Sequence, residues 1–330
     1  MEIVAVKKVG VVFSGFGSQF VGMAKDVYDE SRFAQEYFEE AYNCLNINFV
    51  KLCFASSDEE LSKVDHAYLA IFLTDLILYN LLTEAKIQPT VLAGQDVGMY
   101  AALFAAGGFT FPDGLYLLNK YAGFYQAFLE QHKNLRFIKI NGCTLHKMRT
   151  LCRELSNDQD DQLCISAIIN DNCQIVAGQH KMIKKLEQAL DKLALANPVQ
   201  YSPHNAASGV HCELAQDLIN NFKIYFTKVD FKDLQIPVLS TINGKLITSG
   251  KAVKKELLDQ ELHPVIWPKI IQGLAECEVV IEVGPGQSLA AQIQQVYPDK
   301  IILTLNKKED MVKIRAQLDL DSQDWTDYEE

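Results

Sequence analysis

Short apolar runs that end at glycine or polar turns recur along this chain. Runs of this length predict buried strands that lead into loops. We expect such strands at residues 9–13, 90–93, 236–240 and 279–283. Apolar positions at helical spacing with charged outer faces predict helices at residues 31–41 and 68–82, and a segment rich in Ala, Leu and Tyr predicts a helix at residues 98–106. The alternation of strands and helices indicates a doubly wound α/β fold.

The pattern changes between about residues 135 and 202. There it predicts a strand, a helix, two strands, a helix and a strand, at residues 136–140, 145–155, 164–169, 174–177, 180–193 and 198–201. This β-α-β-β-α-β order is that of a ferredoxin-like unit. We therefore expect a large α/β lobe formed by residues 1–132 and 203–310, interrupted by a ferredoxin-like small lobe at 133–202. The cleft between two such lobes is the default place for a site.

The end of the chain, residues 311–330, is predicted to be an acidic tail. From Asp319 to Glu330 it carries six acidic residues and no basic one. A solvated, frayed end is the favoured interpretation, and a docking tail is the alternative.

Composition narrows the class of protein. With 330 residues, 48% hydrophobic and 22% charged, the chain can bury a large core and is neither disordered nor fibrous. Its 31 basic and 42 acidic residues give a net charge of −11, which repels nucleic-acid phosphate and anionic lipid. We expect neither nucleic acid nor a membrane as a partner.

Targeting and cysteine patterns indicate a reduced cytoplasmic protein. The first residues lack a signal-peptide pattern, and no stretch of 18 uninterrupted apolar residues follows. The eight cysteines form no C-x-x-C pair, so no zinc site is expected. The Gly284-Pro285-Gly286 turn lacks the rest of a phosphate-binding motif, and we expect neither a cofactor nor a metal ion.

The strongest chemical signal is residues 94–98, G-Q-D-V-G, between a predicted strand and a predicted helix. This is the setting of a G-x-S-x-G nucleophile elbow, with Asp96 where the motif has serine. A glycine-flanked aspartate is common in turns, so the pentapeptide alone is weak evidence.

Several motifs follow one another along the chain. They are residues 13–19 (F-S-G-F-G-S-Q), 94–102 (G-Q-D-V-G-M-Y-A-A), 167–170 with 174–178 (A-I-I-N and Q-I-V-A-G), 210–212 (V-H-C), 236–244 (I-P-V-L-S-T-I-N-G) and 281–286 (I-E-V-G-P-G). In this order they resemble the motifs of the malonyl-CoA:acyl-carrier-protein transacylases and related acyltransferase domains of polyketide and fatty-acid synthases. The resemblance spans about residues 9 to 305 and implies an α/β-hydrolase-like large lobe.

The resemblance also implies a chemistry. In the family, a histidine-activated serine takes malonyl from coenzyme A and passes it to the phosphopantetheine thiol of a carrier protein, while an arginine holds the malonyl carboxylate. His211 matches the histidine. The backbone N–H groups of Phe16 and Val97 match the oxyanion pocket.

The departures from the family pattern lie at positions where the family has catalytic or substrate-binding residues. Asp96 replaces the serine, Gln95 the histidine before it and Met99 the glutamate after the second glycine. Tyr121 stands at the arginine, and no arginine occurs between Arg32 and Arg136. The remaining changes are Ser14 for proline, Phe16 for the loop glutamine and Tyr68 for a glutamine. We expect a remodelled pocket formed by Gln95, Met99, Tyr121, Tyr68 and Asn170.

Two roles remain open for each catalytic candidate. Asp96 is either a nucleophile, as at the elbow of haloalkane dehalogenases, or a cap that accepts N–H bonds from its own helix, and we favour the cap. His211 is either a base or the partner of Asp96 in a buried ion pair, and we favour the pair.

These observations favour a divergent member of the family, impaired or inactive in malonyl transfer, that binds an acyl carrier protein or synthase module. Acyl-CoA is a further candidate ligand. The alternative is an enzyme of altered chemistry that uses Asp96 and His211 on an acyl thioester or another small electrophile. A malonyltransferase that works by an unrecognised route is the least favoured.

Overall fold

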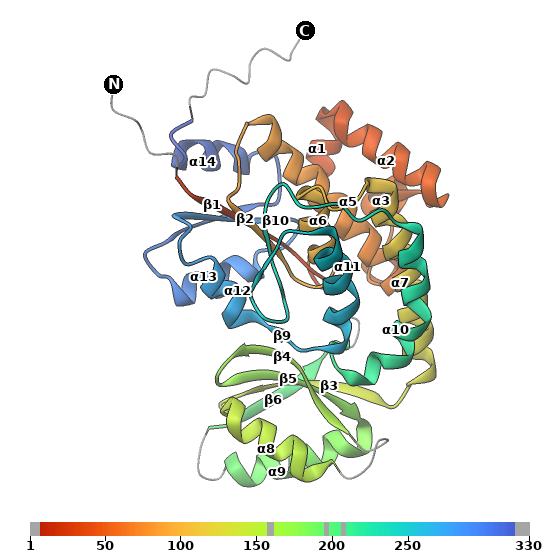
Figure 1. The fold of residues 1–330 in the computed structure, drawn as a ribbon, viewed down its shortest axis with the longest axis vertical. Coiled ribbons are helices and arrows are strands. Elements are labelled where there is room, and N and C mark those ends of the chain that lie inside the picture. Colours follow the sequence, from red (N-terminus) through yellow and green to blue (C-terminus); the bar gives the residue numbers. More distant parts are fainter. Residues whose placement is uncertain (1–6, 157–161, 195–197, 206–208, 321–330) are drawn as a thin grey trace. The chain divides into compact units, whose positions relative to one another are not determined.

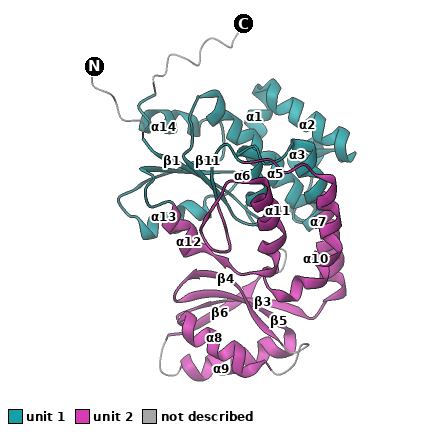
Figure 2. Ribbon diagram, viewed as in Figure 1, with its two compact units in different colours: residues 1–118, 234–238, 274–330 teal, residues 119–233, 239–273 magenta. Residues whose placement is uncertain are grey.

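The computed structural model describes residues 7–156, 162–194, 198–205 and 209–320. The chain divides into two compact units (Figure 2). Unit 1 contains Met1–Leu118, Leu234–Val238 and Leu274–Glu330, and unit 2 contains Asn119–Asp233 and Leu239–Gly273. The predicted insert, 133–202, lies within unit 2, which extends beyond it in both directions.

Unit 1 is built on parallel strands in the order β11-β10-β1-β2-β7 (Figure 1). The strands are β1 (Val9–Phe13), β2 (Val91–Gly94), β7 (Val238–Leu239, whose second residue belongs to unit 2), β10 (Val279–Val283) and β11 (Ile301–Leu305). β1 and β10 are buried along their whole lengths. This is the pattern of a parallel sheet covered on both faces, and it explains why these strands appear as continuous apolar runs.

The helices of unit 1 include a long core helix, α5 (Val64–Glu84). The others are α1 (Lys25–Glu30), α2 (Arg32–Leu45), α3 (Phe49–Ala55), α4 (Asp58–Leu61), α6 (Val97–Ala105), the first part of α7 (Phe111–Gln131), α13 (Ser288–Val296) and α14 (Asp310–Gln317). α5 is the one helix in the described part of the chain that is long and apolar enough to cross a membrane. Because most of it is buried inside the unit, it has the character of a core helix.

Unit 2 has a second sheet, in the strand order β6-β3-β5-β4-β9 (Figure 1). Its strands are β3 (Leu135–Asn141), β4 (Leu163–Asn170), β5 (Cys173–Gln179), β6 (Gln200–His204) and β9 (Val265–Ile266). The short strand β8 (Leu246–Ile247) is not part of this sheet and pairs with β7. The helices are the rest of α7, α8 (Leu145–Leu155), α9 (His180–Ala194), α10 (Gln216–Phe222), α11 (Gly250–Asp259) and α12 (Trp267–Gly273), with 3-10 turns η2 (Glu213–Ala215), η3 (Lys223–Lys228) and η4 (Gln260–Leu262). The apolar faces of α8 and α9 pack together on β3, β4 and β5.

The apolar pattern predicted part of these elements. The strands at 9–13 and 279–283 and the helix at 145–155 have the predicted bounds, and the β-α-β-β-α-β order of the middle segment is present. The strand predicted at 236–240 is limited to Val238–Leu239, and α3, α7 and β11 are among the elements that were not predicted. The predicted tail also differs from the structure. Asp310–Gln317 forms α14, whose Met311 and Ile314 are buried, while residues 321–330 lie outside the described part of the chain.

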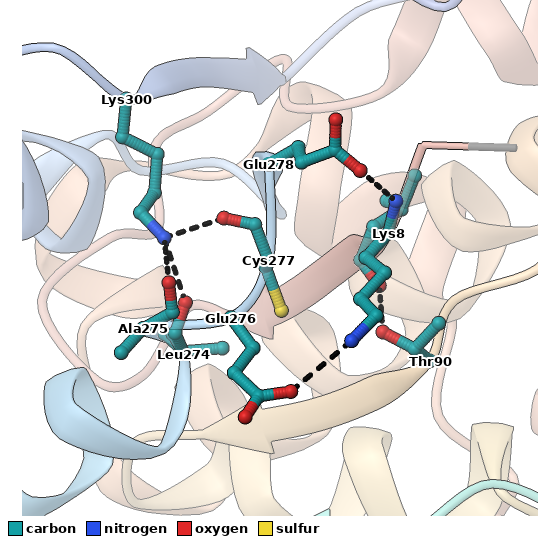
Figure 3. A network of polar contacts seen from close by, with 9 residues as sticks. Lys8, Thr90, Leu274, Ala275, Glu276, Cys277, Glu278 and Lys300 are labelled. Carbon is teal, nitrogen blue, oxygen red and sulfur yellow. Dashed lines mark hydrogen bonds and ion pairs between the residues drawn. The ribbon is translucent and has the colours of Figure 1, made fainter. Parts of the chain in front are cut away.

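A lysine holds together the turn that leads into β10 (Figure 3). The Nζ of Lys300 donates hydrogen bonds to the carbonyls of Leu274 (2.9 Å), Ala275 (2.8 Å) and Cys277. Lys300 immediately precedes β11, so this contact ties two neighbouring strands at their starts. A charged donor near the last carbonyls of a helical segment is also favoured by the helix dipole.

A buried polar cluster lies next to the loop that follows β1. Ser14 Oγ donates to Asp75 Oδ1 at 3.3 Å, and Asp75 on α5 is fully buried. Burial, together with the nearby Glu282, raises the pKa of Asp75 well above 3.8, and the Ser14 bond only partly offsets this. Glu282, also fully buried, accepts the N–H of Ala290 in the first turn of α13 (2.6 Å).

We expect Lys300→Met to lower the free energy of unfolding by about 1–3 kcal/mol, because three carbonyls lose a charged donor and hydrogen bonds to charged groups contribute about that much. Urea denaturation of both proteins measures the difference. Lys313→Met, at an exposed position of α14, is the matched control. An equal loss in both variants would contradict the assigned role.

We expect Asp75→Asn to raise the melting temperature at pH 8 and to make little difference near pH 4. An acid whose pKa is raised in the folded state stabilises the fold below its ordinary pKa, and this stabilisation is lost as the pH rises through the folded value. Asparagine keeps an acceptor for Ser14 and carries no charge. Melting curves from pH 4 to 8 test this, with the exposed Asp65→Asn on the same helix as control. Parallel curves for Asp75→Asn and the unmodified protein would refute it.

Candidate functional site

Asp96 lies at a sharp turn between β2 and α6. Its backbone has φ 54° and ψ −119°, a strained conformation for a residue that is not glycine. The flanking glycines make the turn possible. A Cβ on Gly94 would lie 2.1 Å from the carbonyl carbon of Gly98, and a Cβ on Gly98 would lie 2.4 Å from the carbonyl oxygen of Phe13. The geometry is therefore that of a nucleophile elbow.

The loop after β1 closes directly onto this elbow. A Cβ on Gly15 would lie 2.4 Å from the carbonyl oxygen of Gln95, so only glycine fits there. The Gln95 N–H donates to the carbonyl of Phe13 at 3.2 Å. This approach brings the Phe16 N–H to 3.3 Å from Asp96 Oδ2, to which it donates a hydrogen bond.

The other oxygen of Asp96 is held from α5. Tyr68 donates its hydroxyl hydrogen to Asp96 Oδ1 at 2.9 Å. The Tyr68 and Phe16 rings lie together, with centroids 5.9 Å apart. Asp96 is 4% exposed and Tyr68 is fully buried. Each carboxylate oxygen therefore has a donor from a different part of unit 1.

The expectation that Asp96 caps its own helix is wrong. Asp96 stands at the N-cap position of α6, but within α6, which is described throughout, its side chain accepts no capping hydrogen bond. Capping side chains normally extend from a β-region backbone, whereas φ is 54° here. The carboxylate instead bonds to the β1 loop and to α5.

The remaining predicted residues of the elbow are close to Asp96 in the chain and in space. Met99 is fully buried, and its N–H donates to the carbonyl of Asp96 (3.0 Å). Val97 is fully buried. Gln95 is partly exposed, and its carbonyl accepts the N–H of Gly98 (2.8 Å).

His211, in unit 2, is 4% exposed and also strained, with φ 46°. Its Nδ1 lies 2.9 Å from the carbonyl oxygen of Gln260, which can only accept a hydrogen bond. This contact assigns the proton to Nδ1 and leaves Nε2 as the nitrogen that can take a proton. Gly209 makes room for the ring, because a Cβ there would lie 2.4 Å from Nε2.

A carboxylate that the sequence did not reveal lies beside His211. Glu261 is 1% exposed, and its Oε2 lies 3.9 Å from His211 Nδ1. Tyr121, which the resemblance places at the family's arginine, donates its hydroxyl hydrogen to Glu261 at 2.6 Å. Burial raises the pKa of Glu261, and the interactions with His211 and Tyr121 act in the opposite direction.

Glu261 was missed because the stretch from Leu257 to Leu262 has the charge pattern of a solvated helix end. No motif marks it. Asn170 lies at the exposed hairpin turn between β4 and β5, where its Oδ1 accepts the N–H of Asn172 (2.9 Å). Its place in a pocket therefore stays a prediction.

The structure groups the predicted residues in two sets. Unit 1 brings together Phe16, Tyr68, Gln95, Asp96, Val97 and Met99. Unit 2 links Tyr121 to His211 through Glu261. Among the described residues, no group of three or more His, Cys, Asp or Glu side chains could hold a metal ion.

Known proteins are similar to this chain in sequence and in structure. Residues 11–300 match the acyl transferase domain family. The malonyl CoA-acyl carrier protein transacylase of Bacillus subtilis is 26% identical over 297 residues, which cover 88% of this chain and 91% of that protein.

Solved structures share the fold. The malonyl CoA-acyl carrier protein transacylase of Clostridium perfringens superimposes with a TM-score of 0.87 at 20% identity, covering 94% of this chain and 97% of the other. A malonyl-transacylase solved in complex with a type II PKS acyl-carrier protein gives 0.86 at 20% identity, covering 94% and 99%. With a family match that spans most of its length and an elbow of the expected geometry, this chain belongs to the acyl transferase domain family.

Proposed function

We propose that this protein is a divergent malonyl-CoA:acyl-carrier-protein transacylase-like protein of fatty-acid or polyketide biosynthesis, impaired or inactive in malonyl transfer. It acts by binding a carrier protein or a synthase partner. The observation that carries the proposal is the hydrogen bond from the Phe16 N–H to the carboxylate of Asp96.

That bond uses the donor which acyl transfer would need. In such a reaction, backbone N–H groups stabilise the oxyanion that forms on the substrate. Here a resident carboxylate oxygen already accepts the Phe16 N–H, and Tyr68 binds the second oxygen. Two donors also stabilise the carboxylate and so reduce its nucleophilicity.

The chemistry of the side chain argues in the same direction. Attack by a carboxylate on a thioester gives a mixed anhydride, an intermediate higher in energy than the ester that serine would form. Tyr121 also offers a neutral hydroxyl where the family's arginine would hold a malonyl carboxylate, and that hydroxyl already donates to Glu261. Malonyl transfer therefore lacks both its nucleophile and its carboxylate clamp.

The partner proposal rests on the relatives. Those found by sequence and by structure are malonyl transacylases, and one was solved with an acyl-carrier protein bound. A protein that keeps this fold and loses transfer chemistry can still bind the same class of partner.

The alternative function is an enzyme of altered chemistry. It is favoured by the strain retained at Asp96 and by His211, whose Nδ1–H is fixed by Gln260. In this alternative, Asp96 attacks the thioester carbonyl and displaces the thiolate, which leaves a mixed anhydride on Asp96. His211 Nε2 then takes a proton from the water that hydrolyses this anhydride, which releases the acid and restores the Asp96 carboxylate.

Intact-protein mass spectrometry after incubation with malonyl-CoA or acetyl-CoA separates the two functions. We expect no adduct and no release of coenzyme A above the uncatalysed rate. An adduct on the unmodified protein that is absent from Asp96→Asn would establish the alternative. Transfer of malonyl to a carrier protein at ordinary enzymatic rates would overturn both.

Purified acyl carrier proteins of fatty-acid and type II polyketide synthesis test the binding role. We expect one of them, in its phosphopantetheine form, to bind, and Asp96→Asn to change the Kd by less than about threefold, because this docking does not depend on a transfer step. Calorimetry or biolayer interferometry measures it. If neither carrier binds at a protein concentration of about 100 µM, the carrier-protein role is wrong.

A further inference from the structure

Unit 2 contains a buried carboxyl group next to His211. Glu261 lies on the 3-10 turn η4 directly after Gln260, whose carbonyl orients the histidine. The Glu261 side chain is 2% exposed, and its Oε2 lies 3.9 Å from His211 Nδ1. The same turn therefore supplies the acceptor that orients His211 and the carboxylate that faces it.

Tyr121 fixes the position of the Glu261 carboxyl group. Its hydroxyl donates to Glu261 Oε2 at 2.6 Å. Its ring is held by aromatic neighbours on two elements, with centroid distances of 5.6 Å to Tyr125 and 5.5 Å to Phe222. Tyr121 is 1% exposed. A ring held this way has little freedom to turn, so the hydroxyl and the carboxylate are a rigid pair.

The Tyr121 hydroxyl is an uncharged donor and supplies no positive charge to a ligand carboxylate. The neighbouring cation on α7, Lys120, has its Nζ over the ring of Tyr225, 5.6 Å from the ring centroid. A ligand carboxylate in contact with the Tyr121 hydroxyl would lie about 5 Å from Glu261. At an effective dielectric constant of about 20, the repulsion between two such charges weakens binding by roughly a few hundredfold. A neutral group in that place meets no such penalty.

We propose that Glu261, positioned by Tyr121, is a specificity-determining residue that excludes acyl groups with a free carboxylate and leaves neutral acyl thioesters as the ligand class at His211. This rests on the proposed function, the binding of an acyl carrier protein, which carries its acyl group as a thioester just as coenzyme A does. It adds the kind of acyl group. Burial raises the pKa of Glu261, while the interactions with His211 and Tyr121 oppose this shift; the test is therefore made at pH 8, where the ionised form that the exclusion needs is more favoured than at lower pH.

The test is the ratio of two dissociation constants, for malonyl-CoA and acetyl-CoA, measured by calorimetry at pH 8 on the whole protein. The two ligands share everything except the free carboxylate, so contacts to coenzyme A cancel in the ratio. In the unmodified protein we expect malonyl-CoA to bind at least about a hundredfold more weakly. Glu261→Gln should reduce the ratio by at least about tenfold.

Two variants guard against a general loss of structure. Glu261→Asp keeps the charge and should keep most of the discrimination. Glu256→Gln removes a different buried carboxylate of unit 2, one bound by Ser240 and Thr241, and should leave the ratio unchanged. Melting curves confirm that each variant is folded.

Three outcomes would overturn the proposal, and they distinguish the role of Glu261 from the binding of thioesters. An unchanged ratio in a folded Glu261→Gln variant overturns the role of Glu261 while the thioester site stands. Equal binding of both ligands to the unmodified protein also overturns that role. If the unmodified protein binds neither thioester, the proposed thioester site fails and the specificity assignment fails with it.

Discussion

Two backbone segments of unit 1 approach each other closely, and the geometry at Asp96 depends on this approach. The loop after β1 and the turn between β2 and α6 are so near that Gly15 and Gly98 have no room for a Cβ, and the turn itself leaves none at Gly94. That approach forces Asp96 into a strained backbone and places the Phe16 N–H against its carboxylate. It also explains why the glycines of two distant motifs occur together, since neither segment could adopt its shape without the other.

Buried carboxyl groups occur in both units, and hydroxyl or N–H groups donate hydrogen bonds to them. Asp96 is bound by Tyr68 and Phe16, Asp75 by Ser14, Glu282 by Ala290 and Glu261 by Tyr121. Burying an acid without a cation is costly unless hydrogen bonds satisfy it. These acids therefore depend on donors from the protein's own backbone and side chains.

Fold and site therefore carry different information. Structures at 20% identity superimpose with TM-scores of 0.86 and 0.87, because the alternation of buried strands and amphipathic helices is shared. The residues at the elbow and around His211 decide what that fold can do. At the elbow of this chain the residue is Asp96, and Phe16 and Tyr68 donate hydrogen bonds to its carboxylate.

The amino-acid sequence alone predicted the β-α-β-β-α-β order of the middle segment and the strands at 9–13 and 279–283, because apolar periodicity follows from which faces are buried. It also singled out Asp96, His211, Tyr68 and Tyr121 as candidate site residues. The tertiary structure decided which groups form hydrogen bonds with these side chains. A helix cap was the natural interpretation of Asp96 from its neighbours in the chain, but its carboxylate bonds to Phe16 and to Tyr68, 80 and 28 residues away. Glu261 was undetectable in a charged helix end, since its burial comes from packing against Tyr121, 140 residues earlier. Similarly, Met311 and Ile314 made α14 part of the fold where the local charge suggested a tail. Periodicity reports local burial, whereas a hydrogen bond between distant segments depends on how the whole chain folds.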